Sequence, residues 1–131
     1  MKFKNVFIIG IVVLLLCGCG KTDNSPKKPD NVSQRVYNLG CKVVEVVDKY
    51  MDGDILSSEV YETIKDLSNE IEISVDDNFR RDNIILLSVA IIEMDIFSIK
   101  VDIDYGMPSN DNDLNDLLEH RNSLAGYLEL K

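Results

Sequence analysis

The sequence is poor in the residues that zinc sites and most catalytic centres require. Its 131 residues include one histidine, three cysteines and no tryptophan. A structural zinc site takes four Cys or His ligands at short spacings, and no such spacing is present. Neither a G-x-S-x-G signature nor a glycine-rich phosphate loop occurs. We therefore expect a protein that is not an enzyme. Hydrolysis of wall glycans by two carboxylates is a remote alternative, because nothing selects one pair among the many acids.

Positive charge is also scarce beyond residue 30. Five of the 14 Lys and Arg residues precede Asn31, but only two of the 23 Asp and Glu residues do, so nine bases face 21 acids, a balance of −12. Nucleic-acid binding needs a basic stripe that contacts phosphates, and none is present. The sequence therefore excludes nucleic acid as a partner. It fits a solvated surface, with basic proteins or divalent cations as candidate partners.

No apolar run is long enough to cross a membrane. The N-terminal run extends from Val6 to Leu16 and is interrupted by Gly10, whereas a transmembrane helix needs roughly 18 consecutive apolar residues. Lys2 and Lys4 precede this run, and the layout is typical of a cleaved signal peptide. We therefore expect removal of the segment rather than a permanent span.

The residues that follow are Leu16-Cys17-Gly18-Cys19, which resemble the lipobox of bacterial lipoprotein precursors. The resemblance implies that residues 1–18 are the signal peptide and that the thiol of Cys19 receives a diacylglyceryl group. Cys17 fits that role less well, because Leu15 and Leu16 occupy the positions before it, where a small residue belongs. The alternative is an ordinary secretory signal with two incidental cysteines.

The same resemblance implies a location. A lipoprotein of this class would carry acyl lipid, palmitate among it, on Cys19 and would be anchored to the cell membrane on its extracytoplasmic face. Its partners would be the membrane and an envelope or extracellular protein.

The segment after Cys19 predicts a flexible linker over residues 19–31. Gly20 to Asp30 contains two prolines, several charges and no large apolar residue, so it cannot pack a core and should stay disordered. Fully extended, these residues reach about 36 Å at roughly 3.3 Å each. Residues 32–131 should form a single acidic domain, because about 100 residues suffice for one core and not for two.

Four segments of this domain space their apolar residues alternately three and four apart, which is the repeat of one helical face. Ser57 or Ser58 can cap the second segment and Asp76 or Asp77 the third, while Arg121 is the one polar member of the fourth row. Short breaks favour antiparallel neighbours, so we predict an all-α fold, a small up-down bundle of three to four helices. The four rows are Val36, Leu39, Val43, Val46 and Tyr50; Val60, Ile64, Leu67 and Ile71; Ile85, Val89, Ile92, Ile96, Ile99 and Ile103; and Leu114, Leu117, Leu124 and Leu128.

The third segment has two features that need interpretation. From Phe97 to Tyr105 it also alternates with period two, which is typical of a strand. We predict helix, because the row from Ile85 continues through it and no other segment offers a partner strand. It is also apolar outside its row, so we expect a central helix that is buried on more than one side. The alternative is that the excess apolar face docks a partner or the bilayer surface.

One segment of the sequence is a candidate metal-binding loop. The twelve residues from Asp48 to Glu59 resemble an EF-hand calcium loop, with matches at the first, fifth, sixth, eighth and twelfth positions. Calcium takes six to eight oxygen ligands. The resemblance implies that Asp48, Asp52, the carbonyl of Asp54 and Glu59 supply them.

The loop departs from the EF-hand pattern at two ligand positions. Tyr50 stands at the third position and Leu56 at the ninth, where polar groups are usual. The alternative, which we favour, is a plain helical turn in which Gly53 ends the first helix in a left-handed conformation. That interpretation requires no cofactor.

Cys41 and His120 complete the candidate residues. With Cys17 removed and Cys19 lipidated, Cys41 has no intramolecular partner, so the domain must depend on its apolar core. Cys41 lies roughly opposite the apolar row of its helix. It is therefore a candidate free thiol that could pair two molecules or react with oxidants; burial by a flanking helix is the alternative. For His120 we expect a solvated side chain.

Overall fold

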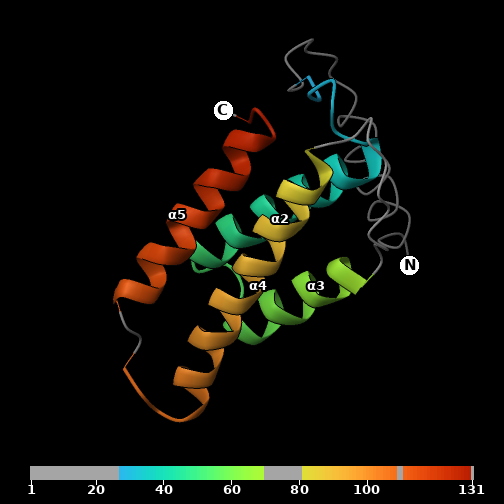
Figure 1. Ribbon diagram of the computed structural model, residues 1–131. Helices are drawn as coiled ribbons and strands as arrows, with labels where there is room; N and C mark the ends of the chain where they lie inside the picture. The colour runs from blue at the N-terminus through green and yellow to red at the C-terminus, as the bar shows by residue number, and fades with distance from the viewer. Residues whose placement is uncertain (1–26, 70–80, 109–110, 131) are drawn as a thin grey trace, which may run out of the picture.

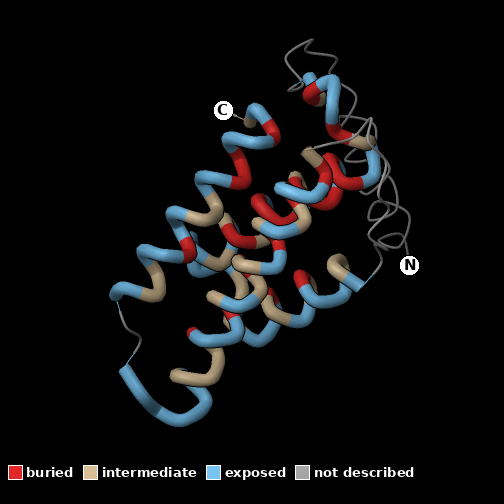
Figure 2. The backbone as a smooth tube through the Cα atoms, in the orientation of Figure 1, coloured by how far each residue is buried: buried red, intermediate tan, exposed pale blue. Residues whose placement is uncertain are grey.

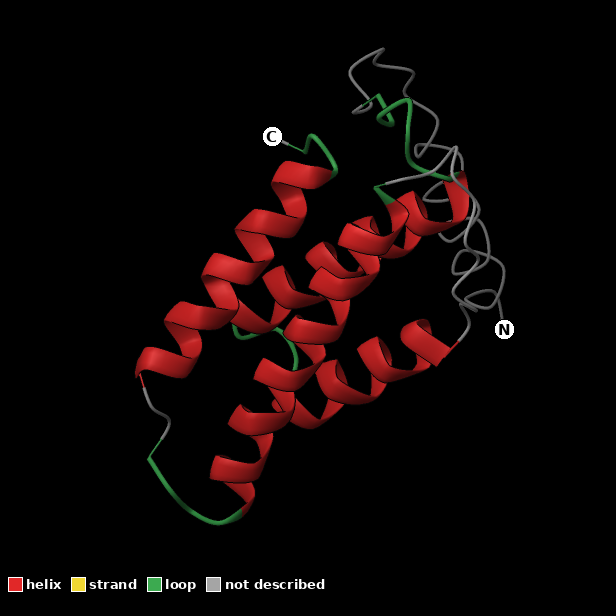
Figure 3. Ribbon diagram, viewed as in Figure 1, coloured by secondary structure: helices red, strands yellow, loops and turns green. Residues whose placement is uncertain are grey.

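The computed structural model describes residues 27–69, 81–108 and 111–130. Within these ranges the chain forms four α-helices and no strand (Figure 3). The helices are α2 (Gln34–Met51), α3 (Ser57–Asn69), α4 (Asp82–Asp104) and α5 (Asp111–Tyr127). They alternate in direction, and α4 lies between α3 and α5 with α2 behind it (Figure 1). The predicted all-α up-down bundle is confirmed. Among the described residues, no helix combines the length and the apolar character that a membrane crossing requires.

The helix ends follow from local sequence. The hydroxyl of Ser33 caps α2 by accepting a hydrogen bond from the amide of Val36 at 3.3 Å. At the end of α4, Gly106 adopts a φ of 67°, and the amide of Met107 donates to the carbonyl of Asp102 at 2.8 Å. This Schellman arrangement satisfies carbonyls that have no partner within the helix, and glycine adopts its left-handed residue without strain.

The inward face of α4 is the centre of the core. Its five buried apolar residues are spaced alternately four and three apart, and α4 contacts α2, α3 and α5. Each such side chain contributes about 1.5–3 kcal/mol when it is removed from water. The predicted row is thereby confirmed except at Ile103, which is exposed near the helix end. The five residues are Ile85, Val89, Ile92, Ile96 and Ile99.

Of two predictions about α4, the prediction that it stays helical after Phe97 is confirmed, and the prediction that it is buried on more than one side is not. The stretch from Phe97 to Asp104 is helical, so the strand alternative is wrong. The expectation that α4 is buried on more than one side is also wrong, because Leu87 and Met94 are 63% and 71% exposed. Three neighbouring helices cover only the inward side and the flanks of α4. Figure 2 shows buried and exposed segments alternating along the helix.

The other apolar rows match the structure in part. In α2 the buried face is wider than predicted and includes Tyr37, Val44 and Val47, while Val46 and Tyr50 are only half-buried. The reason is that α2, like α4, contacts three helices. The predicted caps Asp76 and Asp77, with Ile71 of the second row, lie outside the described residues; the other rows supply core residues such as Val60, Ile64, Leu117 and Leu124.

The last residues of the predicted linker are packed, so the expectation of disorder up to Asp30 is wrong there. Pro29 is buried and Val32 is fully buried in the core. The ammonium group of Lys28 donates hydrogen bonds to the carbonyls of Pro29 at 3.3 Å and Val32 at 2.6 Å. Val32 draws these residues onto the bundle because its side chain joins the apolar core.

Two polar contacts hold the starts of α2 and α4 and the end of α5 together. The carboxylate of Asp82, which is buried, accepts a hydrogen bond from the amide of Ser33 at 2.8 Å. Arg81 forms an ion pair with Glu129 at 3.1 Å. The entry to the domain and the C-terminal turn therefore lie at the same end of the bundle.

Gly40 permits α2 to pack closely against the end of α5. A Cβ atom at this position would lie 2.8 Å from Leu128 Cδ1 and 3.3 Å from Ile85 Cγ2. We predict that Gly40→Val lowers the free energy of unfolding by about 1–3 kcal/mol, because extra carbons would displace a fully packed leucine. Urea denaturation followed by circular dichroism measures this change.

Gly126→Val is the matched control. Gly126 is also helical, but no heavy atom lies within 4 Å of its hypothetical Cβ. This variant should unfold at nearly the wild-type urea concentration. Equal destabilisation by the two variants would contradict a steric role for Gly40.

Candidate functional site

The loop between α2 and α3 is a helix C-terminal turn. Gly53 has a φ of 81°, and its amide donates to the carbonyl of Tyr50 at 3.0 Å. The amide of Asp54 donates to the carbonyl of Lys49 at 2.8 Å. These two bonds define a Schellman motif. The interpretation in which Gly53 ends the first helix in a left-handed conformation is confirmed.

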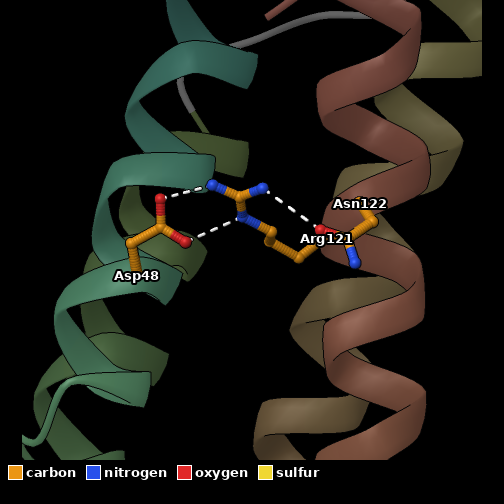
Figure 4. Close-up of polar contacts among 3 residues, drawn as sticks. All are labelled: Asp48, Arg121 and Asn122. Atoms are coloured by element: carbon orange, nitrogen blue, oxygen red, sulfur yellow. Dashed lines mark hydrogen bonds and ion pairs between the residues drawn. The ribbon is translucent and has the colours of Figure 1, made fainter. Parts of the chain in front are cut away.

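Asp48, the first residue of the EF-hand-like loop, is paired with Arg121 of α5 (Figure 4). The Nε and one terminal nitrogen of the guanidinium donate to the two carboxylate oxygens at 2.7 and 2.5 Å. The other terminal nitrogen donates to Asn122 at 3.2 Å. This bidentate geometry joins α2 to α5 and occupies the carboxylate that the calcium alternative would need as its first ligand.

The other three predicted calcium ligands lie at the surface. Asp52 and Asp54 are exposed in the turn, and Glu59 is exposed in the first turn of α3. Across the three described ranges, no group of three His, Cys, Asp or Glu side chains is placed to hold a metal ion. The structure thus gives the twelve-residue segment a helix end and an interhelical ion pair.

The thiol of Cys41 is free and half-buried at the edge of the core. Burial raises the pKa of Cys41, and a hydrogen bond with Tyr37 opposes part of that rise. Because the thiolate is the reactive form, this environment reduces nucleophilicity at neutral pH. The predicted lipidation residue, Cys19, lies outside the described residues.

His120 and three carboxylates line the junction between α4 and α5. The side chain of His120 is 38% exposed, as expected for a solvated histidine, but its Nδ1 also lies 2.7 Å from Asp95 Oδ2, a contact that the sequence did not predict. Further along the same junction, the pKa of Asp113 is raised. Desolvation is the largest cause, and the charge of Asp102 and a hydrogen bond with Asp102 add to it. This edge of the bundle therefore carries concentrated negative charge.

The outward face of α4 exposes several large apolar side chains. Leu87 and Met94 lie two turns apart, with the half-buried Ile91 between them and Phe97 beside them, itself 49% exposed. The ring of Phe97 packs against Tyr61 of α3, with 5.5 Å between centroids. The sequence predicted these apolar residues but assigned them to the core. Sequence reasoning also missed the role of Arg121, although its position in an apolar row was the available signal.

Comparison of the chain with protein-family models, with curated proteins and with solved structures found no match.

The ion pair between Asp48 and Arg121 should contribute to stability by an amount that a double-mutant cycle can measure. For Asp48→Asn and Arg121→Met we predict a coupling energy of about 0.5–1 kcal/mol. The value is modest because the Asp48 side chain is 46% exposed and solvent screens it. Added salt should reduce the coupling.

Lys49 and Glu45 provide the control pair. They form an i,i+4 ion pair at 2.8 Å on the exposed face of α2, for which about 0.3 kcal/mol is usual. Additive effects of the two Asp48 and Arg121 substitutions would show that their bidentate geometry adds nothing to stability.

Calcium provides a second test of this region. We predict no rise in melting temperature when about 1 mM calcium replaces magnesium, because the ion would have to displace Arg121 from Asp48. Differential scanning fluorimetry of the full-length chain measures the effect. A calcium-specific rise that disappears in Glu59→Gln would instead support the EF-hand-like loop.

Proposed function

We propose that the chain is a lipid-anchored lipoprotein of the bacterial cell envelope whose folded domain is a non-enzymatic interaction module. The segment Leu16-Cys17-Gly18-Cys19, directly after a short apolar run, carries this proposal. The domain is held by lipid on Cys19 at the extracytoplasmic face of the cell membrane. There it presents its acidic surface to another envelope protein or to an extracellular one.

The physical chemistry of the anchor supports this assignment. Each buried methylene contributes about 0.8 kcal/mol, so one acyl chain binds a membrane weakly, whereas two hold it stably. The diacylglyceryl group supplies two chains. Residues 20–27 then connect the anchor to the point where Lys28 and Pro29 contact the bundle.

The interaction role is supported by exposed apolar residues that the contacts between helices do not use. Asp48 joins α2 to α5, and Asp95 contacts His120 across α4 and α5, so these pairs connect helices. On the outward face of α4, Leu87 and Met94 are exposed outside the buried core and remain available to a partner.

Cys19→Ala tests the proposal. It should abolish incorporation of labelled palmitate and shift the protein out of its membrane location, because alanine offers no thiol for the lipid. Metabolic labelling with cell fractionation measures both effects.

Two matched variants are the controls. Cys17→Ala and Cys41→Ala each remove one thiol and should retain full labelling, since neither occupies the final lipobox position. Continued labelling of Cys19→Ala would overturn the assignment of the anchor.

A further inference from the structure

Helix α4 carries a second apolar seam on the side opposite its core face. We define the outer seam as the row Ile84, Leu87, Ile91, Met94, Ser98 and Val101. Its members are spaced alternately three and four residues apart, and none is charged. This is the spacing by which one helix packs lengthwise against another. At 1.5 Å per residue the outer seam extends about 26 Å, which is enough for a partner helix of several turns.

The outer seam is separate from the bundle core. The residues that fill the core from α4, such as Ile92 and Ile96, are fully buried. Leu87 and Met94 are among the more exposed apolar side chains of the described residues, and Ile84 is also exposed. Large apolar side chains that are exposed to water do not stabilise the isolated domain. Contiguous apolar surface of this kind marks an interaction site.

The positions that border the outer seam on α4 carry only negative charge. Asp95 and Asp102 follow the border that faces α5, and Asp104 lies at the end of the opposite border. In helix pairs these bordering positions select the partner through charge. Lys100 pairs with Asp104 at 2.6 Å and offsets its charge, and Lys65 lies over the ring of Tyr61 on α3 at 5.6 Å, so the negative charge is concentrated on the border that faces α5.

The border facing α5 is made more acidic by α5 itself. Desolvation raises the pKa of Asp113, and the charge of Asp102 and a hydrogen bond with Asp102 raise it further, which places the two carboxylates next to one another. A second copy of this chain would place the same acids opposite one another, which is unfavourable. A helix with Lys or Arg at its bordering positions would meet them with opposite charge.

We propose that the outer seam of α4 docks an amphipathic helix of a partner protein, with an apolar face that contacts Leu87 and Met94 and bordering Lys or Arg residues that face Asp102 and the neighbouring Asp113. This inference rests on the proposed interaction role and gives that role a surface and a class of partner. The two ideas are separable, because the anchor depends on Cys19 and the docking surface lies on α4.

The test uses two synthetic helical peptides of three heptads with the same leucine seam. One carries lysine at the bordering positions and the other carries glutamate. The full-length chain, held in phosphatidylcholine nanodiscs, is titrated into each labelled peptide, and fluorescence anisotropy reports binding. The lysine peptide should bind about tenfold or more tightly than the glutamate peptide.

Variants of the chain locate the binding surface. The double variant Leu87→Ser with Met94→Ser should weaken binding of the lysine peptide by about tenfold or more. Leu56→Ser is the matched control, because Leu56 is 73% exposed but lies in the turn before α3. It should bind as the wild type does. Circular dichroism checks that each variant keeps its helix content.

Three results would overturn the proposal. Equal affinity for the two peptides would remove the charge selection, and unchanged affinity in the double variant would place the contact elsewhere. The third concerns other occupants of the outer seam. The chain has no tryptophan, so in the variant Met94→Trp the tryptophan fluorescence reports on position 94 alone. A blue-shifted emission maximum in the absence of peptide would assign the outer seam to the bilayer or to a second copy.

Loss of the anchor gives a different signature. Cys19→Ala in detergent should bind the lysine peptide with wild-type affinity while it loses palmitate. Failure of peptide binding with normal lipidation would reject the docking surface alone.

Discussion

The packing of the inward face of α4 against three helices is the constraint on which the rest of the bundle depends. Ile85, Ile92 and Ile96 are fully buried there, and the domain has no disulfide to replace them, since Cys41 is free. All cohesion must therefore come from apolar burial and a few interhelical polar contacts. Gly40 belongs to this constraint, because α2 can approach Leu128 and Ile85 only where a side chain is missing.

The rows of apolar residues predicted the fold because a helical face is a local property of sequence. Spacing identified the core positions of α4 from Ile85 to Ile99, and it correctly favoured helix over strand after Phe97. Spacing could not show how many neighbours each helix has. For that reason α2 buries Tyr37 and Val47 beyond its predicted row, whereas the excess apolar residues of α4 are exposed rather than buried.

The candidate site shows the same division between local and distant information. Gly53 could be assigned from sequence because glycine tolerates a left-handed backbone that other residues avoid. The pairing of Asp48 with Arg121 could not, because 73 residues separate them along the chain and only the packing of α2 against α5 brings them together. A carboxylate that resembles a calcium ligand in sequence is thus a cross-link between helices in the fold.

The residues before α2, the start of α4 and the turn after α5 meet at one pole of the bundle, and this has a mechanical consequence. Pro29 and Val32 are packed immediately before α2, Ser33 is bonded to Asp82 at the start of α4, and Arg81 reaches Glu129 after α5. A pulling force applied through the residues before Lys28 would act first on these contacts, which distribute it to α4 and α5. The end of α4 and the start of α5 lie at the opposite pole (Figure 1) and would carry little of this load. The long axis of α4 would then align with the direction of pull. Its outward face would therefore run parallel to the pull and would be exposed to the side.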